Sequence, residues 1–443
     1  MWTSINQALN IIDNFVWGVP LMVLIIAGGL LLTIRLGLLQ IRKLPLALKW
    51  MLQNEEGGKG EISSFSALCT ALSATIGTGN IVGVATAVCA GGPGALFWMV
   101  VAAFLGMATK YSEGLLAVKY RTVAEDGHSL GGPFYYIELG MGKKFKWLAK
   151  IFAFFGVCVG LFGIGTFSQV NGISSAVHGF FDPNDAFTVK ILPFLGEYSW
   201  SVVIASLILS FCVAAVLIGG VKRIASVSQI IVPFMAVIYF VFAVILICCN
   251  ITKVPAAFAT IVTAAFSPKA ITGGAVGSML IAMQKGVARG IFSNEAGLGS
   301  APIAAAAAQT NSPVRQGLVS MTGTFIDTII ICTLTGLSIV LTGAWQVEGL
   351  EGVQVTTYAF QHGLPFPAQF SSFILMLCLV FFAFTTILGW DYYSERCLEY
   401  LSGGNMKHVK IFRWIYILAV FIGPYMTVSA VWTIADIFNG LMA

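Results

Sequence analysis

One apolar segment near the N-terminus is interrupted by glycines and hydroxyl residues. It reads Ala71-Leu-Ser-Ala-Thr-Ile-Gly-Thr-Gly-Asn-Ile-Val-Gly83 and lies in a stretch, 63–90, long enough to cross a bilayer. Such a composition favours a break in the helix at membrane depth. Free backbone N–H and C=O groups are tolerated there only where they line an enclosed cavity or hold a ligand, so the break predicts a binding site.

The composition is that of a polytopic membrane protein. Of the 443 residues, 58% are hydrophobic and only 10% are charged, which is far from the average of soluble domains. We therefore expect an all-α fold. Hydropathy predicts 11 transmembrane helices, at residues 15–39, 63–90, 94–118, 148–180, 199–219, 226–248, 271–298, 317–342, 369–400, 410–424 and 426–442.

Basic residues in the loops predict the orientation. They follow the first, third, fifth, seventh and ninth predicted spans, and basic loops face the cytoplasm. The N-terminus is therefore predicted outside and the C-terminus inside. The net charge of +5 comes from these short loops and gives no argument for nucleic-acid binding. The basic residues are Arg42, Lys43, Lys49, Lys59, Arg121, Lys143, Lys144, Lys146, Lys222, Arg223, Arg315, Lys407 and Lys410.

The spans also predict a repeat within one transmembrane transport domain, 1–443. Setting aside the extra N-terminal helix at 15–39, five spans fall in 63–248 and five in 271–443. An odd number of spans makes the two halves run in opposite directions. Each half opens on an interrupted span, Ser73 to Gly83 and Gln284 to Gly297, which indicates an inverted repeat with the site between its halves.

The first interrupted span offers groups for an anion. Its second half begins at about Thr78, so the N–H groups of Thr78 and Gly79 point into the break at the positive end of a helix dipole. This arrangement suits a carboxylate. Gly77 and Gly79 let a ligand approach the backbone, since neither has a Cβ. The alternative is that Gly77, Gly79 and Gly83 form a small-residue face for close helix packing.

The same break offers groups for a cation. Carbonyls released just before it, from about Ser73 to Ile76, lose their helical partners and are hard oxygen ligands suited to Na⁺. The side chains of Thr75 or Asn80 can join them. One break can thus hold both an anion and a cation.

Five motifs resemble the alanine or glycine:cation symporter family. The resemblance covers essentially the whole chain, including the leading span, and motifs of this length in this order are highly specific. They are Ala74-Thr-Ile-Gly-Thr-Gly-Asn-Ile81, Gly91-Gly-Pro-Gly94, Gly106-Met-Ala-Thr-Lys-Tyr111, Gly286-Val-Ala-Arg-Gly290 and Ser293-Asn-Glu-Ala-Gly-Leu-Gly-Ser-Ala-Pro302.

The resemblance implies a leucine-transporter-like fold of five plus five inverted helices. It implies uptake of small neutral amino acids, such as alanine, glycine, serine or glutamine, coupled to Na⁺ by alternating access, with H⁺ coupling as the alternative. Na⁺ is then the coupling ion, and the amino acid and the lipid bilayer are the partners. A prokaryotic inner membrane is also implied by the family.

The resemblance also implies which residues bind. In this fold the carboxylate lies on the amides of Thr78 and Gly79, and two adjacent hydroxyls on the eighth core helix complete the commonest Na⁺ site. This sequence offers Thr385-Thr386 there, unless both hydroxyls bond to the preceding turn of their own helix. One cation is expected near the carbonyls of Ser73 and Ile76, and a second near Thr75 and Asn80.

Further polar and flexible residues are expected to line the pocket. Gln169 lies in the middle of a span, where its amide needs a partner, and Phe167 beside it can form a wall. A hydrogen bond between helices explains Gln169 equally well. In the second interrupted span, Met279, Met283 and Gln284 are expected to face the substrate side chain, although methionine also fills gaps.

Charged residues inside the spans have other expected roles. Lys285, Arg289 and Glu295 are expected to form a gate or ion-pair network on the inner side, because charges within a membrane protein pair or face water. Glu113 and Asp327 occupy matching places in the two halves and are expected to pair with Lys110 or a hydroxyl, with a proton relay as the alternative. Further along the chain, Asp391 and Glu395 are expected in a solvated cluster at the cytoplasmic end of a span.

Two other classes of function fit the sequence less well than transport. An enzyme generally needs a positioned base, and all four histidines, His128, His178, His362 and His408, fall in loops or at span ends. An ion channel usually builds its filter from repeated rings in an oligomer, whereas this chain carries two unlike halves with two broken helices. The sequence therefore favours a transporter over an enzyme or a channel.

Overall fold

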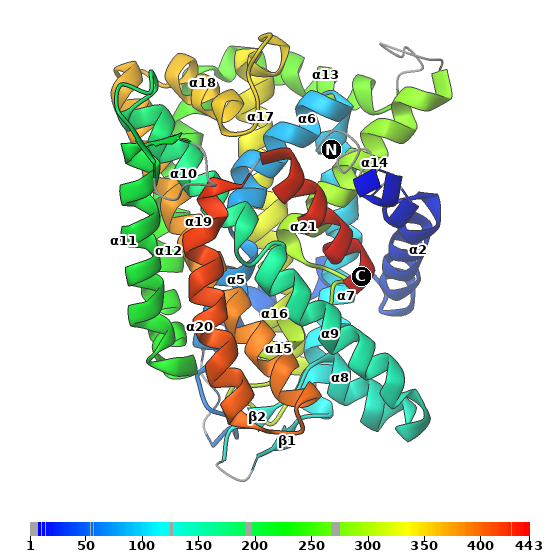
Figure 1. Cartoon of the computed structure of the whole chain (residues 1–443). Helices are drawn as coiled ribbons and strands as arrows, with labels where there is room; N and C mark the ends of the chain where they lie inside the picture. The colour runs from blue at the N-terminus through cyan, green and yellow to red at the C-terminus, as the bar shows by residue number, and fades with distance from the viewer. Residues whose placement is uncertain are drawn as a thin grey trace.

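Helices make up nearly all the regular structure of the chain (Figure 1). A computed structural model describes residues 8–9, 11–13, 15–53, 55, 57–124, 127–190, 197–266, 275–426 and 428–443. Within these ranges the only strands form two short antiparallel hairpins, β1–β2 and β3–β4. The prediction of an all-α polytopic membrane protein is confirmed at this level.

The first part of the chain, to residue 249, begins with the N-terminal helix α2 and contains both hairpins. In order the elements are α2 (Val19–Arg35), α3 (Leu39–Arg42), α4 (Leu44–Met51), α5 (Ser64–Thr75), the π-helix η1 (Gly79–Gly83), α6 (Val84–Gly91), α7 (Gly94–Lys119), β1 (Thr122–Val123), β2 (Ser129–Leu130), α8 (Pro133–Tyr136), the π-helix η2 (Ile137–Met141), η3 (Lys143–Phe145), α9 (Lys146–Phe162), α10 (Phe167–Phe181), β3 (Thr188–Lys190), β4 (Glu197–Ser199), α11 (Trp200–Leu217) and α12 (Gly220–Cys249).

The second part begins with a short apolar helix, α13, that the hydropathy analysis did not predict. Its elements are η4 (Ile251–Lys253), α13 (Val254–Phe266), α14 (Ala275–Asn294), α15 (Ala301–Ala305), α16 (Pro313–Thr324), the π-helix η5 (Phe325–Cys332), α17 (Thr333–Thr342), η6 (Ala344–Gln346), α18 (Val353–Gly363), α19 (Ala368–Leu401), α20 (Met406–Ile422), η7 (Gly423–Tyr425) and α21 (Val428–Met442).

Six helical stretches of the described chain are long and apolar enough to cross a membrane, and the bent pair of α5 with η1–α6 makes a seventh. The apolar helices Pro20–Arg35, Ile251–Phe266 and Val431–Met442 are shorter. Several spans are thus confirmed. The number of 11, the inverted repeat and the leucine-transporter-like arrangement stay predictions.

The outer surface of α11 and α12 suits contact with lipid. Leu207, Phe211, Ile230 and Val237 are 54%, 75%, 69% and 60% exposed. Large contiguous apolar surfaces of this kind are rare on soluble monomers. The exposed apolar side chains therefore support the membrane location that the sequence predicts.

Interruptions divide two of the predicted spans, 63–90 and 148–180, and a third predicted span, 271–298, ends where an interruption was expected. The first span bends by 51° between α5 and the helical stretch Gly79–Gly91. In the second interrupted span, α14 runs without a break past Gln284 and ends at Asn294, where Glu295 takes a φ of +56°. Another interruption, which the sequence analysis did not predict, separates α9 from α10. The break predicted in the first span therefore exists. In the second, the stretch predicted to be interrupted, Gln284 to Gly297, is helical as far as Asn294, where the helix ends.

Local sequence explains where these elements begin and end. The Ser63 hydroxyl accepts the N–H of Ser66 and so caps α5, while Pro313 occupies the first turn of α16 after the Ser312 cap. Gly92, with a φ of +71°, allows the tight turn from α6 to α7. These ends fix where the broken span enters and leaves the helical bundle.

Candidate functional site

The break in the first span leaves two backbone amides facing side-chain oxygens. The Gly77 N–H donates to Asn80 Oδ1 and the Thr78 N–H donates to Gln169 Oε1, both over 2.9 Å. In an uninterrupted α-helix these amides would instead donate to the carbonyls of Ser73 and Ala74. The break therefore presents N–H donors at Gly77 and Thr78 in one buried place, whereas the sequence analysis expected them at Thr78 and Gly79.

Thr386 of α19 reaches this break. Its hydroxyl donates to the carbonyl oxygen of Ile76 over 3.2 Å and to that of Phe382 over 3.0 Å. The neighbouring Thr385 hydroxyl donates to Phe382 O and lies 3.6 Å from the Met235 sulfur. Of the predicted hydroxyl pair, the structure brings only Thr386 to the released carbonyls.

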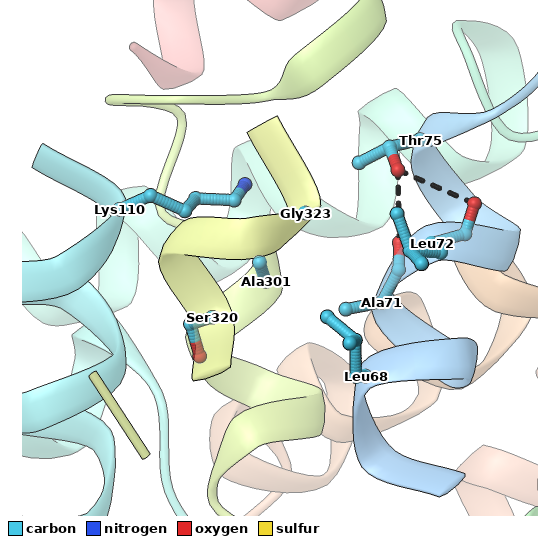
Figure 2. A pocket seen from close by; sticks show the side chains of 8 residues that line it. All are labelled: Leu68, Ala71, Leu72, Thr75, Lys110, Ala301, Ser320 and Gly323. Atoms are coloured by element: carbon cyan, nitrogen blue, oxygen red, sulfur yellow. Dashed lines mark hydrogen bonds between the residues drawn. The ribbon is translucent and has the colours of Figure 1, made fainter. Parts of the chain in front are cut away.

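The hydroxyls of Thr75, an expected side-chain ligand, and of Ser73, expected to contribute its carbonyl, bond within their own helix. Ser73 Oγ donates to the Thr70 carbonyl over 2.7 Å, and Thr75 Oγ1 donates to the carbonyls of Ala71 and Leu72 (Figure 2). The Thr75 side chain also lines a small cavity that leaves ≈ 10 Å³ for the centre of a water molecule. This cavity lies between α5, α7, α15 and α16 and is lined by Leu68, Ala71, Leu72, Thr75, Lys110, Ala301, Ser320 and Gly323.

A buried carboxylate holds Asn80 in place. Asn80 Nδ2 donates to Asp327 Oδ1 over 2.7 Å, and the hydroxyls of Ser293 and Thr328 donate to Asp327 Oδ2 over 2.9 and 2.6 Å. Asn80 lies in the π-helix η1 and Asp327 in the π-helix η5. π-Helical turns are rare and frequently mark functional sites. The break is thus tied to α14 and η5 through a polar network.

Close packing surrounds the glycines of the break. A Cβ at Gly77 would lie 2.5 Å from Thr386 Oγ1 and 2.8 Å from Gln169 Oε1. A Cβ at Gly79 would face α14 instead, 3.2 Å from the Cα of Ser293. Gly77 therefore faces the polar centre that the break exposes, and Gly79 faces a neighbouring helix.

The Thr78 side chain points toward α10. It is 0% exposed, and among the described residues its hydroxyl has no hydrogen-bond partner. A Cβ at Gly172 would lie 2.5 Å from Thr78 Cγ2. A buried hydroxyl without a partner costs free energy, so Thr78 is suited to receive a polar ligand atom.

Four other predicted pocket residues lie away from the break. Phe167 packs with Ala419 and Val431, and its ring centroid is 5.9 Å from that of Phe162. Gln284 Nε2 donates to the Trp17 carbonyl over 3.1 Å, and Met283 packs in the same cluster as Trp17. Met279 is half-buried on the same helix, α14. The structure does not bring these four side chains to the Gly77 and Thr78 amides.

The charged residues of the second interrupted span divide into two networks. Arg289 pairs with Asp436 of α21 over 2.5 Å, and its guanidinium lies 5.2 Å from the Trp432 ring centroid. Glu295 instead accepts the Trp390 indole N–H over 2.8 Å, and its carbonyl accepts Lys110 Nζ over 3.1 Å. The expected single network of Lys285, Arg289 and Glu295 is therefore split.

Asp13 interacts electrostatically with the network that contains Arg289 and Asp436. Burial and, to a smaller extent, the negative charge of Asp436 raise the pKa of Asp13 from 3.8 to about 6, against the opposing effect of Arg289 and Lys285. Asp13 precedes the N-terminal helix. The charge cluster therefore joins the start of the chain to α14 and α21.

The pair of carboxylates on α19 is not solvated. Asp391 and Glu395 are 0% and 6% exposed, which corrects the expectation of a water-exposed cluster. Arg413 of α20 binds Glu395 with two hydrogen bonds of 2.6 and 2.9 Å. Two parallel hydrogen bonds from one guanidinium to a carboxylate permit burial of the Glu395 charge. Hydropathy does not reveal which helix supplies the arginine.

The sequence analysis missed several residues of this site. Asp436, Trp432 and Arg413 come from the last two helices and contact α14 and α19 only in the folded chain. Asp327 was noticed as a charge within a span, but its contact with Asn80 was not expected. A carboxylate in the middle of a span is a functional candidate by itself, and that signal was present.

Comparisons with known proteins agree with the resemblance stated above. The model of the sodium:alanine symporter family matches residues 2–443. The sodium/alanine symporter AgcS of Methanococcus maripaludis is 46% identical over 98% of this chain and 92% of its own length. An uncharacterized transporter of Haemophilus influenzae is 55% identical over 99% of this chain and 92% of its own.

A third relative differs in its named substrate. The probable sodium/glutamine symporter GlnT of Bacillus subtilis is 36% identical over 100% of this chain and 87% of its own length. These relatives are named as transporters, and so the prediction of a membrane transporter rather than an enzyme is confirmed. By the family match over its whole length, the chain belongs to the sodium:alanine symporter family.

Proposed function

We propose that the chain is a symporter that takes up small neutral amino acids together with Na⁺ by alternating access. The observation that carries this proposal is the pair of amides at Gly77 and Thr78, each held by a side-chain amide oxygen. Both amides are buried donors that require an acceptor. The carboxylate of an amino acid is such an acceptor and can take the place of Gln169 Oε1.

The cation is proposed to bind on the other side of the break. Ile76 O and Thr386 Oγ1 lie 3.2 Å apart and supply two hard oxygen atoms, and Ser73 O is released by the loss of its helical partner. Asn80 lies between this region and Asp327. The hydroxyls of Thr75 and Thr385 bond to preceding carbonyls of their own helices, so each must turn away from that carbonyl to bind the cation.

The dimensions of the site favour a small substrate. Gly77 and Thr78 are closely enclosed by Gln169, Thr386 and Gly172. Alanine, glycine and serine suit this space, and two relatives are named for alanine and for glutamine. Glutamine has a longer side chain, so it requires the side chains that enclose the break, those of Gln169 and Thr386, to move apart.

The proposed setting is a prokaryotic inner membrane. The N-terminus lies outside and the C-terminus in the cytoplasm, as the distribution of Lys and Arg predicts. In this orientation α5 enters from the cytoplasmic side and α6 leaves toward the outside. H⁺ coupling in the same fold is the alternative mechanism, and an ion channel is the alternative of a different class.

Uptake into proteoliposomes tests the proposal. We expect labelled alanine to accumulate above its equilibrium level under an inward Na⁺ gradient, and unlabelled glycine, serine and glutamine to compete in order of fit. A pH gradient without Na⁺ tests H⁺ coupling in parallel vesicles. Passage of Na⁺ without accumulation of any amino acid would instead identify a channel and overturn symport.

A further inference from the structure

Two segments that are far apart in the chain are joined where α5 begins. Ile62 and Ala308 form a parallel β-bridge, in which the Gln309 N–H donates to Ile62 O over 2.8 Å and the Glu61 N–H donates to Ala307 O over 2.9 Å. We call residues 57–62 and 306–311 together the clasp. One half of the clasp precedes the first broken span and the other follows the second.

Arg121 binds both halves of the clasp at once. Its guanidinium donates to the carbonyls of Lys59 and Thr310 over 2.7 Å each, to Ala308 O over 2.8 Å and to Ala306 O over 3.3 Å. Arg121 lies between Tyr120, which caps α7, and the first residue of β1, at the end of the molecule that carries the β1–β2 hairpin (Figure 1). Four carbonyls around one guanidinium use its fork of donors in a way that a lysine ammonium cannot reproduce.

The clasp is closely fitted as well as hydrogen-bonded. A Cβ at Gly60 would lie 2.3 Å from Ala308 O, and a Cβ at Gly58 would lie 2.6 Å from Gln309 O. The Glu55 carboxylate also accepts the Thr310 hydroxyl over 2.5 Å. The two chain segments therefore approach each other with no room for side chains between them.

We infer that Arg121 is a positioning residue of the transport cycle, which closes the inner route by holding the two halves of the clasp together. The inference rests on the proposed alternating access and adds the device that closes one side. The segments just before α5 and just after α15 meet at the clasp, so opening between these two helices toward the predicted cytoplasm requires its hydrogen bonds to separate. When they re-form around Arg121, α5 and the segment after α15 move together again.

Hydrogen exchange of backbone amides tests this directly, because the clasp is made of them. We expect the Arg121→Ala variant to exchange at least tenfold faster than wild type in peptides covering 57–62 and 306–311. Arg121→Lys should lie between the two, since it keeps the charge but not the fork. Arg42→Ala is the matched control, because Arg42 lies on the same predicted face and donates to Gly37 O in its own segment.

Transport provides a second readout. A larger inward-open population lowers the fraction of carriers that can bind substrate from outside, so the apparent KM for external alanine should rise at least threefold in Arg121→Ala. Gly58→Ala should raise both the amide exchange rate of the clasp and the apparent KM without altering Arg121. This variant remains informative if the arginine variants do not fold. Its steric effect is independent of charge.

Specific results would overturn the inference. Unchanged exchange at 306–311 in both Arg121→Ala and Gly58→Ala would reject the clasp, and faster exchange with an unchanged KM would reject its part in transport. If wild-type vesicles accumulate no amino acid, the proposed function fails while the exchange result still reports on the clasp. The two proposals therefore fail in different measurements.

Discussion

Asn80 and Asp327 join two π-helical turns at the buried centre of the protein, with Asn80 Nδ2 2.7 Å from Asp327 Oδ1. This contact fixes the direction of the Asn80 amide. Its oxygen then points back to the Gly77 N–H, which would otherwise lack an acceptor. The Asp327 carboxylate in η5 thus orients the Asn80 side chain so that its oxygen, and not its NH₂ group, faces the break.

Replacing Asp327 tests this network. Asp327→Ala leaves Asn80, Ser293 and Thr328 without their acceptor, at a cost of about 1–3 kcal/mol for each buried group that stays unpaired. Asp327→Asn should be milder, because its oxygen can still accept from Asn80 and its NH₂ can donate to the two hydroxyls. Thermal unfolding in detergent, together with alanine uptake, checks whether Asp327→Ala loses more stability and activity than Asp327→Asn. Equal losses in the two variants would contradict it.

Thr386→Ala should weaken activation by Na⁺ more than substrate binding at saturating Na⁺. Loss of one oxygen ligand is expected to raise the Na⁺ concentration for half-maximal uptake about tenfold, which corresponds to roughly 1.4 kcal/mol. Thr260→Ala is the control, because that exposed threonine bonds to Ala256 O within α13. Uptake measured at increasing Na⁺ concentrations tests this prediction. Unchanged activation by Na⁺ in Thr386→Ala would show that Thr386 is not a ligand of the cation.

Gln169→Leu should destabilise the empty protein and increase its response to substrate. The variant leaves the buried Thr78 N–H unpaired, at about 1–3 kcal/mol, and a bound carboxylate then satisfies it. Alanine should therefore raise the thermal midpoint of the variant more than that of wild type. Gln361→Leu on α18 serves for comparison. A smaller alanine effect in Gln169→Leu would mean that the side chain mainly holds the substrate.

Two alanine substitutions distinguish the faces of the broken helix. Gly77→Ala forces its Cβ against Thr386 Oγ1 and Gln169 Oε1, at 2.5 and 2.8 Å, and should abolish uptake. Gly79→Ala meets α14 at 3.2 Å and should reduce uptake less. Gly28→Ala, with nothing within 4 Å, should leave uptake near wild type. Initial rates normalised to protein amount provide the test, and wild-type uptake by Gly77→Ala would refute the pose.

Asp13 predicts a pH-dependent stability. Its pKa is raised from 3.8 to about 6, so the folded state holds the proton more tightly than the unfolded state. The stability that Asp13 contributes is therefore complete below about pH 4 and is lost as the pH rises through about 6. Asp13→Asn should have a higher thermal midpoint than wild type at pH 7 and an equal one near pH 4. Glu348→Gln, in an exposed loop, should show no such crossover.

The local features of the site were predictable from the sequence. Gly77 and Gly79 next to hydroxyls, inside an apolar stretch, predicted the break, and Gln169 stood out as a lone amide within a span. The separation of Thr385 from Thr386 was not predicted, because the sequence offers both hydroxyls side by side. In the structure only Thr386 contacts a released carbonyl, that of Ile76.

The arrangement of distant helices was not predictable in this way. Met283 and Gln284 contact the N-terminal helix, because α2 occupies the side of α14 that was expected to face the substrate. The partner of Glu395 on α20, Arg413, depends on how two helices pack. Periodicity gives the face of a helix that is apolar, but not which other helix covers it.

Because Gly79–Gly83 is wound as a π-helix, the geometry of the site depends on the number of residues in this segment. A wide turn accommodates one more amino acid than regular winding over the same rise. Deleting a single residue there would rotate α6 by about 100° relative to α5, so the Asn80 amide and the Gly77 N–H would no longer meet. Insertions and deletions in these five positions should be more harmful than most substitutions.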